Sequence, residues 1–93
     1  MKPLIAANWK MNKDIKEADS FIKNFKNHIK NTKDTEIVIC APFTLLSELK
    51  RLLNKSNIIL GAQNMHFEKE GAFTGEVSAS MLKDIGCEYV ILG

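Results

Sequence analysis

The chain has 93 residues and a net charge of +2, from 13 lysines and arginines against 11 aspartates and glutamates. Because acidic and basic residues are interleaved, we expect no large positive patch of the kind that binds nucleic acid or a membrane surface. The sequence also lacks a run of about 18 apolar residues, which a membrane-spanning helix requires, and the apolar segment of a secretory signal peptide. These features predict one small globular domain with neither nucleic acid nor membrane as a partner.

The first predicted element is a short buried strand at residues 4–9, and polar side chains follow directly at its end: Asn8, Lys10 and Asn12. In parallel α/β folds, ligands bind at the carboxyl ends of the strands. Asn8 and Lys10 are therefore candidates for a binding or catalytic site, because an amide donor and an ammonium group suit an anionic ligand. The alternatives are a solvated lysine and an asparagine that only caps a turn. Trp9 is expected to pack in the core.

The second predicted element is an amphipathic helix over residues 14–31. Its apolar residues recur at spacings of three and four, as one buried face of a helix requires; they are Ile15, Ala18, Ile22, Phe25 and Ile29. Asn12 or Asp14 is positioned to cap its amino end.

The later predicted elements alternate in type: a strand at 36–41, a helix at 45–54, a strand at 57–63, a short helix from 78 to 85 and a strand at 87–92. Thr44 and Ser78 are expected to cap the two helices, and Gly86 to end the second one. The strands are continuous apolar runs, which is typical of a parallel sheet covered on both faces. Cys40 and Cys87 lie within these runs and are expected to be buried, reduced thiols of a cytoplasmic protein.

The connection at residues 64–76 is long for a parallel α/β fold, and it carries three apolar side chains, Met65, Phe67 and Phe73. Loops of this length are usually functional or disordered, so an interface and a disordered loop both remain open. His66 is expected on the loop surface. Gln63 and Asn64 precede the loop at a strand end and are expected to be hydrogen-bonding scaffold residues.

The last predicted strand is followed at once by the final residue, Gly93. Four strands and three helices amount to about half of a closed eight-unit barrel, and the functional residues of such barrels follow the strands. We therefore expect a truncated chain. The alternative is a small open sheet that ends naturally on a strand.

Five groups of motifs, in order and at matching spacing, resemble the triosephosphate isomerase family. They are Ala-Asn-Trp-Lys-Met-Asn at 7–12, Ala-Pro-Phe at 41–43, Gly-Ala-Gln-Asn at 61–64, Gly-Ala-Phe-Thr-Gly-Glu-Val-Ser at 71–78, and Met-Leu-Lys-Asp-Ile-Gly at 81–86 with Tyr-Val-Ile-Leu-Gly at 89–93. The resemblance covers the whole chain. It implies an α/β fold: the amino-terminal part, the first four strands, of a (β/α)8 TIM barrel, with parallel strands and outer helices. Residues 1–93 would form a single partial barrel domain.

The resemblance also implies an activity. The family interconverts dihydroxyacetone phosphate and glyceraldehyde 3-phosphate, in glycolysis and gluconeogenesis, by proton transfer through an enediol(ate) and without metal or organic cofactor. It places Lys10 as a catalytic residue and Asn8 with Lys10 in substrate binding. The family's use of a glutamate base and a neutral histidine is an established example of pKa tuning. Both residues would lie beyond Gly93, so the 93-residue chain alone is expected to be inactive.

Finally, the resemblance implies a homodimer in the full-length protein. Phe73, Thr74 and Gly75 would contact the neighbouring subunit near its Met11. Two alternatives remain. One is a non-catalytic half-barrel that self-associates or pairs with a complementary chain, which would cover its open edges. The other is a small flavodoxin-like binding module, which is disfavoured because the first strand-to-helix loop lacks a phosphate-binding glycine cluster.

Overall fold

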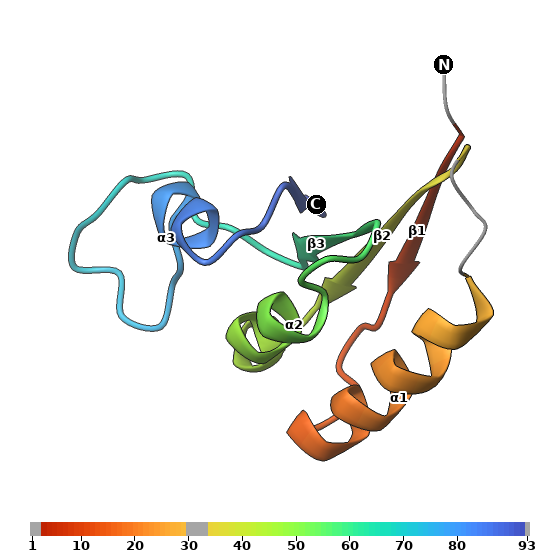
Figure 1. The fold of residues 1–93 in the computed structure, drawn as a ribbon. Helices are drawn as coiled ribbons and strands as arrows, with labels where there is room; N and C mark the ends of the chain where they lie inside the picture. The colour runs from red at the N-terminus through yellow and green to blue at the C-terminus, as the bar shows by residue number, and fades with distance from the viewer. Residues whose placement is uncertain (1–2, 30–33, 93) are drawn as a thin grey trace.

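The computed structural model describes residues 3–29 and 34–92, which form a curled sheet of four parallel strands with helices (Figure 1). The strands lie side by side in chain order: β1 (Leu4–Asn8), β2 (Glu36–Ala41), β3 (Ile58–Ala62) and β4 (Tyr89–Val90). Every neighbouring pair is parallel. The predicted parallel α/β fold is therefore confirmed, and all four carboxyl ends lie along one edge of the sheet.

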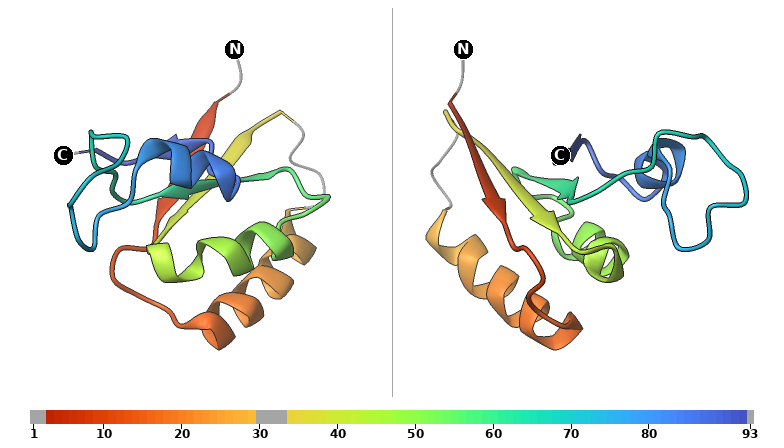
Figure 2. Two further views of the ribbon diagram at one scale, coloured as in Figure 1. Left: turned by 90° about the vertical axis from the view of Figure 1, so that its left-hand side faces the viewer. Right: turned by 180° about the vertical axis from the view of Figure 1, so that it is seen from behind.

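The connections between the strands contain the helices α1 (Ile15–His28), α2 (Leu46–Leu52) and α3 (Ala79–Asp84), and a 3₁₀ turn, η1 (Phe43–Leu45), leads into α2. Figures 1 and 2 show that these helices lie along one side of the sheet. Within the part of the chain that the structure describes, no helix is long and apolar enough to cross a membrane.

The hydrophobic core lies between the helices and the two central strands. Alternate residues of β2 face the helices, and they join one cluster with residues of α1, α2 and β3: Ile22, Ile37, Ile39, Ala41, Leu46, Leu49 and Leu60. The other β2 residues, Val38 and Cys40, are buried on the opposite face. Gly61 of β3 makes that face possible, because a Cβ there would lie 2.7 Å from Cys40 Sγ.

Local capping explains where α1 and α3 begin and where α3 ends. Asp14 caps α1: its Oδ1 accepts from the Glu17 amide at 2.8 Å, and Glu17 Oε1 accepts from the Asp14 amide at 3.0 Å. This reciprocal arrangement is a capping box. Ser78 caps α3 by accepting from the Met81 amide at 3.3 Å. Gly86 follows α3 with a φ of +97°, a conformation that glycine adopts without strain. These predicted helix signals are confirmed.

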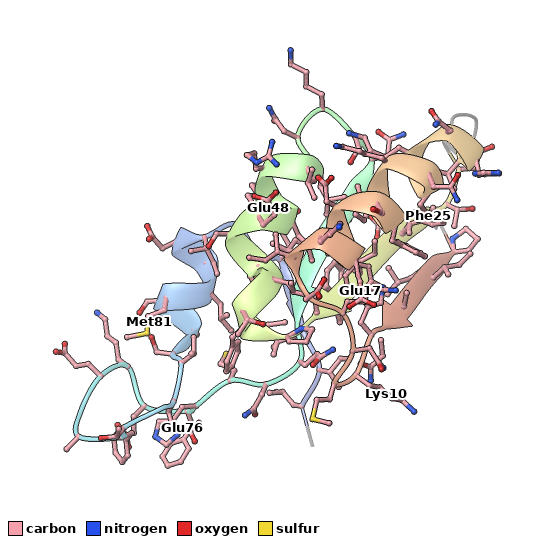
Figure 3. All side chains as sticks on the ribbon, turned by 90° about the horizontal axis from the view of Figure 1, so that it is seen from below. Lys10, Glu17, Phe25, Glu48, Glu76 and Met81 are labelled. Carbon is pink, nitrogen blue, oxygen red and sulfur yellow. The ribbon has the colours of Figure 1, made fainter. Side chains whose placement is uncertain are left out.

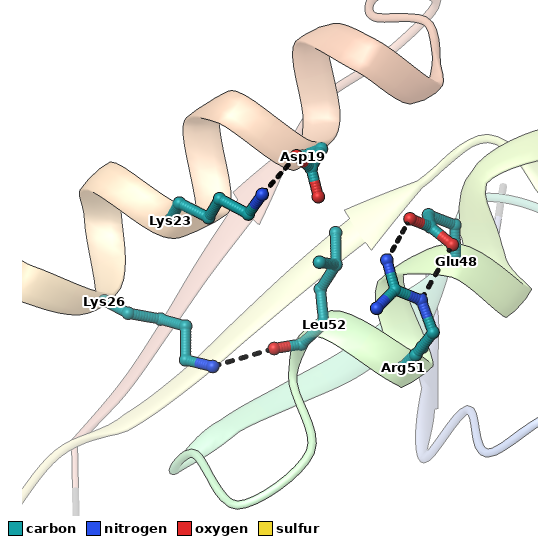
Figure 4. A network of polar contacts seen from close by, with 6 residues as sticks. All are labelled: Asp19, Lys23, Lys26, Glu48, Arg51 and Leu52. Carbon is teal, nitrogen blue, oxygen red and sulfur yellow. Dashed lines mark hydrogen bonds and ion pairs between the residues drawn. The ribbon is translucent and has the colours of Figure 1, made fainter.

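Polar side chains of α1 and α2 form contacts both between the two helices and within each helix (Figure 4). Lys26 of α1 donates to the Leu52 carbonyl at the end of α2, with an Nζ–O distance of 2.8 Å. This bond supplies a partner to a carbonyl that no longer has one within its own helix, and it ties α2 to α1. Two exposed ion pairs, Lys23–Asp19 and Arg51–Glu48, join residues within single helices and contribute little to stability.

Several predicted boundaries were wrong. Thr44 does not cap α2, because the chain after Pro42 turns through η1, with the Leu45 amide donating to the Pro42 carbonyl at 3.0 Å. The helix ends at Leu52 rather than at residue 54. The last strand is shorter than predicted and spans only β4. The Cys87 amide ends α3 by donating to the Leu82 carbonyl at 3.0 Å, and the amides on either side of β4, those of Glu88 and Ile91, donate to the β3 carbonyls of Leu60 and Ala62 at 2.9 and 3.0 Å. The first helix, predicted through residue 31, ends earlier, at His28 with Ile29 as its C-cap; residues 30–31 lie outside the described residues.

The predicted burial of the first strand was also wrong. Every residue of β1 is exposed, including Leu4 and Ile5 at 50% and 57%. The reason is its position: β1 pairs only with β2, and α1 packs mainly against α2. The two cysteines are free, as expected; Cys40 is buried, but Cys87 is only half-buried.

Candidate active site

The carboxyl edge of the sheet brings together the polar residues that follow β1 and β3. Asn8 is the last residue of β1, and Gln63 comes directly after β3. Gln63 Nε2 lies 3.3 Å from Asn8 Oδ1 and 2.8 Å from the Lys10 carbonyl oxygen. The structure therefore joins Asn8, Lys10 and Gln63 into one hydrogen-bonded group, although more than 50 positions separate Gln63 from the other two. Gln63 is confirmed as a hydrogen-bonding scaffold residue.

Lys10 has a strained backbone, with a φ of +55°. This left-handed conformation costs roughly 1–2 kcal/mol in a residue that has a Cβ. Asn8 supports it locally, because its Oδ1 accepts from the Lys10 amide at 2.8 Å. Strain of this kind in a non-glycine residue gathers at functional sites, where the surrounding contacts maintain it. Because Lys10 also follows the end of a strand, Lys10 and its neighbours are the first candidate for a functional site.

Trp9 also holds the loop after β1, by anchoring it to the hydrophobic core. Its indole is buried in the core, as predicted, and meets the Phe21 ring edge-on with 5.4 Å between centroids. Lys13, which also has a left-handed backbone, places Nζ 5.3 Å and 4.8 Å from the centroids of the Trp9 and Phe21 rings. Asn12 donates to the Trp9 carbonyl at 2.8 Å. The backbone around Lys10 is thus fixed by neighbours on both sides.

The chemical character of the group is that of an anion site. Lys10 is exposed, and its side chain extends away from the sheet (Figure 3). Asn8 Oδ1 already accepts hydrogen bonds, whereas its Nδ2 has no partner among the described residues. An ammonium group and an amide donor on residues two positions apart in one loop can bind a phosphate or carboxylate oxygen. The described residues contain no group of three histidines, cysteines or acidic residues that could hold a metal ion.

The long loop lies apart from this group. Figure 3 shows Glu76, near the end of the loop, well away from Lys10. Phe73, Thr74 and Gly75 are exposed on the loop, and Met11 is 94% exposed beside Lys10. Within the described chain, the residues predicted for the interface therefore occupy two separate exposed places.

His66 gives the loop internal order and corrects the prediction of a surface residue. Its side chain is only 16% exposed, and its ring lies between those of Phe67 and Phe73, with centroid distances of 4.6 and 4.3 Å. Its amide donates to the Val77 carbonyl at 2.8 Å, which closes the base of the loop. The other histidine, His28, is exposed in the last turn of α1. Both histidines are therefore remote from Lys10.

The sequence model for triosephosphate isomerase matches residues 3–93. The chain belongs to the triosephosphate isomerase family. The triosephosphate isomerase of Alkaliphilus oremlandii is 56% identical over 92 residues, which cover 99% of this chain and 37% of that protein. The enzyme of the same name from Aquifex aeolicus is 52% identical over 93 residues, which cover 100% of this chain and 38% of that protein.

The fold agrees with this family. A crystal structure of triosephosphate isomerase from Bartonella henselae superposes with a TM-score of 0.89 at 42% identity, and the match covers 100% of this chain and 38% of that one. The chain thus spans a little over a third of the length of the relatives it matches, and its four strands match the amino-terminal part of a TIM barrel.

Proposed function

We propose that this chain is the amino-terminal part of a triosephosphate isomerase, which interconverts dihydroxyacetone phosphate and glyceraldehyde 3-phosphate through an enediol(ate). One observation carries the proposal beyond family membership. Lys10 has a strained backbone just after β1, and Asn8, which supports it, has an amide donor without a partner among the described residues. Strain of this kind clusters at active sites and ligand clamps, where neighbouring contacts maintain it.

Lys10 and Asn8 have distinct roles in this proposal. The substrate carries a phosphate dianion, and negative charge develops on its oxygens as the enediolate forms. Lys10 supplies a fixed positive charge at this point, which lowers the energy of the charged transition state more than that of the substrate. Asn8 donates from Nδ2 to a substrate oxygen and so helps to orient it.

The proposal assigns no complete catalytic apparatus to residues 1–93. The histidine and glutamate that the family uses for proton transfer would follow Gly93. In support of this, His66 packs between two phenylalanine rings in the long loop and His28 lies at the far end of α1. We therefore expect the chain alone to be inactive and the complete protein to be active in the cytoplasm, where two free cysteines remain reduced.

The test is an isomerase assay on the complete protein, with Lys10→Ala as the decisive variant. Loss of the cation should lower kcat/KM roughly 100- to 1,000-fold, the range for removing one preorganised stabilising group. Lys55→Ala is a matched control, because Lys55 is also an exposed lysine with a left-handed backbone, at φ +66°, but precedes β3 at the opposite edge of the sheet. Wild-type activity in Lys10→Ala would exclude Lys10 from the mechanism.

We further propose that the complete protein is a homodimer, in which Phe73, Thr74 and Gly75 contact the neighbouring subunit near Met11. Two features support this. The loop is ordered internally by His66, so it can dock with little loss of conformational entropy. Its tip nevertheless leaves Phe73 44% exposed, and Met11 is almost fully exposed. Apolar side chains that project from an ordered loop are typical of an interface.

The dimer is tested by Thr74→Arg in the complete protein. A charge without a partner in a packed contact is costly, so the dimer dissociation constant should rise at least about tenfold, equivalent to about 1.4 kcal/mol. Ser20→Arg, which adds the same side chain to the exposed surface of α1, is the control. Sedimentation velocity over a concentration series measures both. A profile that Thr74→Arg does not change would contradict the proposed interface.

A further inference from the structure

Gln63 makes three contacts through a single nitrogen at the carboxyl edge of the sheet. Its Nε2 lies 2.8 Å from the Lys10 carbonyl oxygen, 3.0 Å from the Cys40 carbonyl oxygen and 3.3 Å from Asn8 Oδ1. An amide NH₂ has two hydrogens, so the two shorter contacts take one each and the third is shared. The Cys40 carbonyl also accepts from the Trp9 amide at 3.0 Å, which belongs to the pairing of β1 with β2.

These contacts cross the sheet. Gln63 follows β3, whereas Lys10 follows β1, and β2 lies between the two strands. Adjacent strands are about 4.8 Å apart, so the side chain bridges a separation of about 10 Å. The Cys40 carbonyl at the end of β2 lies on the way and is used as a second acceptor. The next shorter amide side chain, asparagine, has one methylene less and does not reach as far.

The backbone of Lys10 is thereby held at both of its peptide groups. Its N–H donates to Asn8 Oδ1 at 2.8 Å, and its C=O accepts from Gln63 Nε2. The orientations of these two peptide groups define φ and ψ of Lys10. The first bond is local and comes from the same loop. The second comes from β3 and anchors the strained conformation to the sheet.

The same nitrogen sets the orientation of the Asn8 side chain. With the Lys10 amide and Gln63 Nε2 both directed at Oδ1, the side-chain carbonyl of Asn8 is occupied from two sides. A flipped amide would place Nδ2 against these two donors. The flip is disfavoured, and Nδ2 stays directed away from them.

We infer that Gln63 is a positioning residue: it keeps Lys10 in its left-handed conformation and Asn8 with its amide donor free, without contacting the substrate itself. The inference rests on the proposed function for its effect on catalysis, but its structural part, the anchoring of residues 9–13 to β3, does not.

The test uses Gln63→Met in the complete protein, because methionine keeps the length of the side chain and removes all three hydrogen bonds. A small misplacement of a catalytic group costs up to about 100-fold in rate, so kcat should fall roughly 10- to 100-fold. The same substitution in a Lys10→Ala background should change kcat less than about twofold, because the group that Gln63 positions is already absent. Asn57→Leu, which removes an exposed amide before β3, is the control.

A merely structural role predicts a different pattern. Lower stability or a smaller active fraction would reduce kcat by the same factor with and without Lys10, and that result would overturn the inference. Full activity in Gln63→Met would overturn it as well. If Gln63→Met does not fold, Gln63→Asn takes its place; its shorter amide should produce the same dependence on Lys10.

Hydrogen exchange separates this inference from the proposed function. The amides of Trp9 and Lys10, which donate to the Cys40 carbonyl and to Asn8 Oδ1, should exchange at least about tenfold faster in Gln63→Met than in the wild type, while those of α2 stay unchanged. If the wild-type protein shows no isomerase activity, the proposed function fails, and exchange alone decides the anchoring. Unchanged exchange at the Trp9 and Lys10 amides would overturn the anchoring whatever the activity.

Discussion

Strands β1 and β2 are neighbours of similar sequence character, yet their environments are opposite. Both are short apolar runs paired in register, so that Ile5 lies beside Ile37 and Ala6 beside Val38. In β2, every residue after Glu36 is buried, whereas every residue of β1 is exposed. The difference lies in the neighbours, because β2 has a strand on both sides and helices over one face. A run of apolar residues thus predicts a strand, but its burial depends on what the rest of the protein supplies.

The largest effect on the free energy of unfolding is expected from a substitution in β2. Ile39 is 1% exposed and belongs to the core between the sheet and the helices. Ile39→Ala removes three carbons from a packed site, which should lower the free energy of unfolding by about 2–5 kcal/mol. Urea unfolding of the 93-residue chain measures this loss from the shift of the midpoint at constant slope. A loss below about 1 kcal/mol would mean that β2 is not packed as described.

Thiol labelling compares the two strands on the same face of the sheet. Cys40 is buried in β2, and burial raises the pKa of its thiol above the ordinary value. Since only the thiolate reacts, Cys40 should react slowly at pH 8, and its rate should keep rising with pH beyond the point where a free cysteine levels off. A cysteine introduced by Ala6→Cys on exposed β1 should react on the order of 100-fold faster.

The control for labelling is Cys87 in the same sample, which is half-buried and whose pKa is also raised by burial. Mass spectrometry of the labelled peptides gives the three rates separately. Equal rates at Cys40 and at the Ala6→Cys position would contradict the difference in burial between β2 and β1.

The parts of the fold that the sequence predicts well are those determined by residues close together in the chain. Asp14 and Glu17 form a capping box across three positions, and Gly86 ends α3 by its own left-handed backbone. The cap predicted at Thr44 failed because the turn after Pro42 uses backbone hydrogen bonds instead. That choice depends on how η1 enters the core through Leu45, which a local pattern does not contain.

The candidate site divides in the same way. Asn8 and Lys10 were predicted because polar residues at a strand end follow directly from the order of residues. The left-handed backbone of Lys10 had no such signal, since lysine is not a residue that favours it. Gln63 was predicted as a scaffold residue, but its acceptors could not be named, because they lie 23, 53 and 55 positions away and meet it only when β1 and β3 flank β2. The dimer contacts of the long loop stay a prediction.

The smallest effect is expected at Ile5, the register partner of Ile37. Ile5 is 57% exposed in this chain, so Ile5→Ala removes few contacts and should lower the free energy of unfolding by less than about 1 kcal/mol, mostly through the lower strand propensity of alanine. Ile37→Ala at the neighbouring buried position should cost several times more.

The same pair of substitutions, measured in the complete protein, sharpens the comparison. If the rest of a barrel covers β1, the cost of Ile5→Ala should rise toward that of Ile37→Ala. A cost that stays small in both proteins would mean that β1 remains an uncovered edge, contrary to a closed barrel. A large cost already in the 93-residue chain would mean that another surface covers β1, and the chain's concentration dependence would then distinguish a second copy from contacts within one chain.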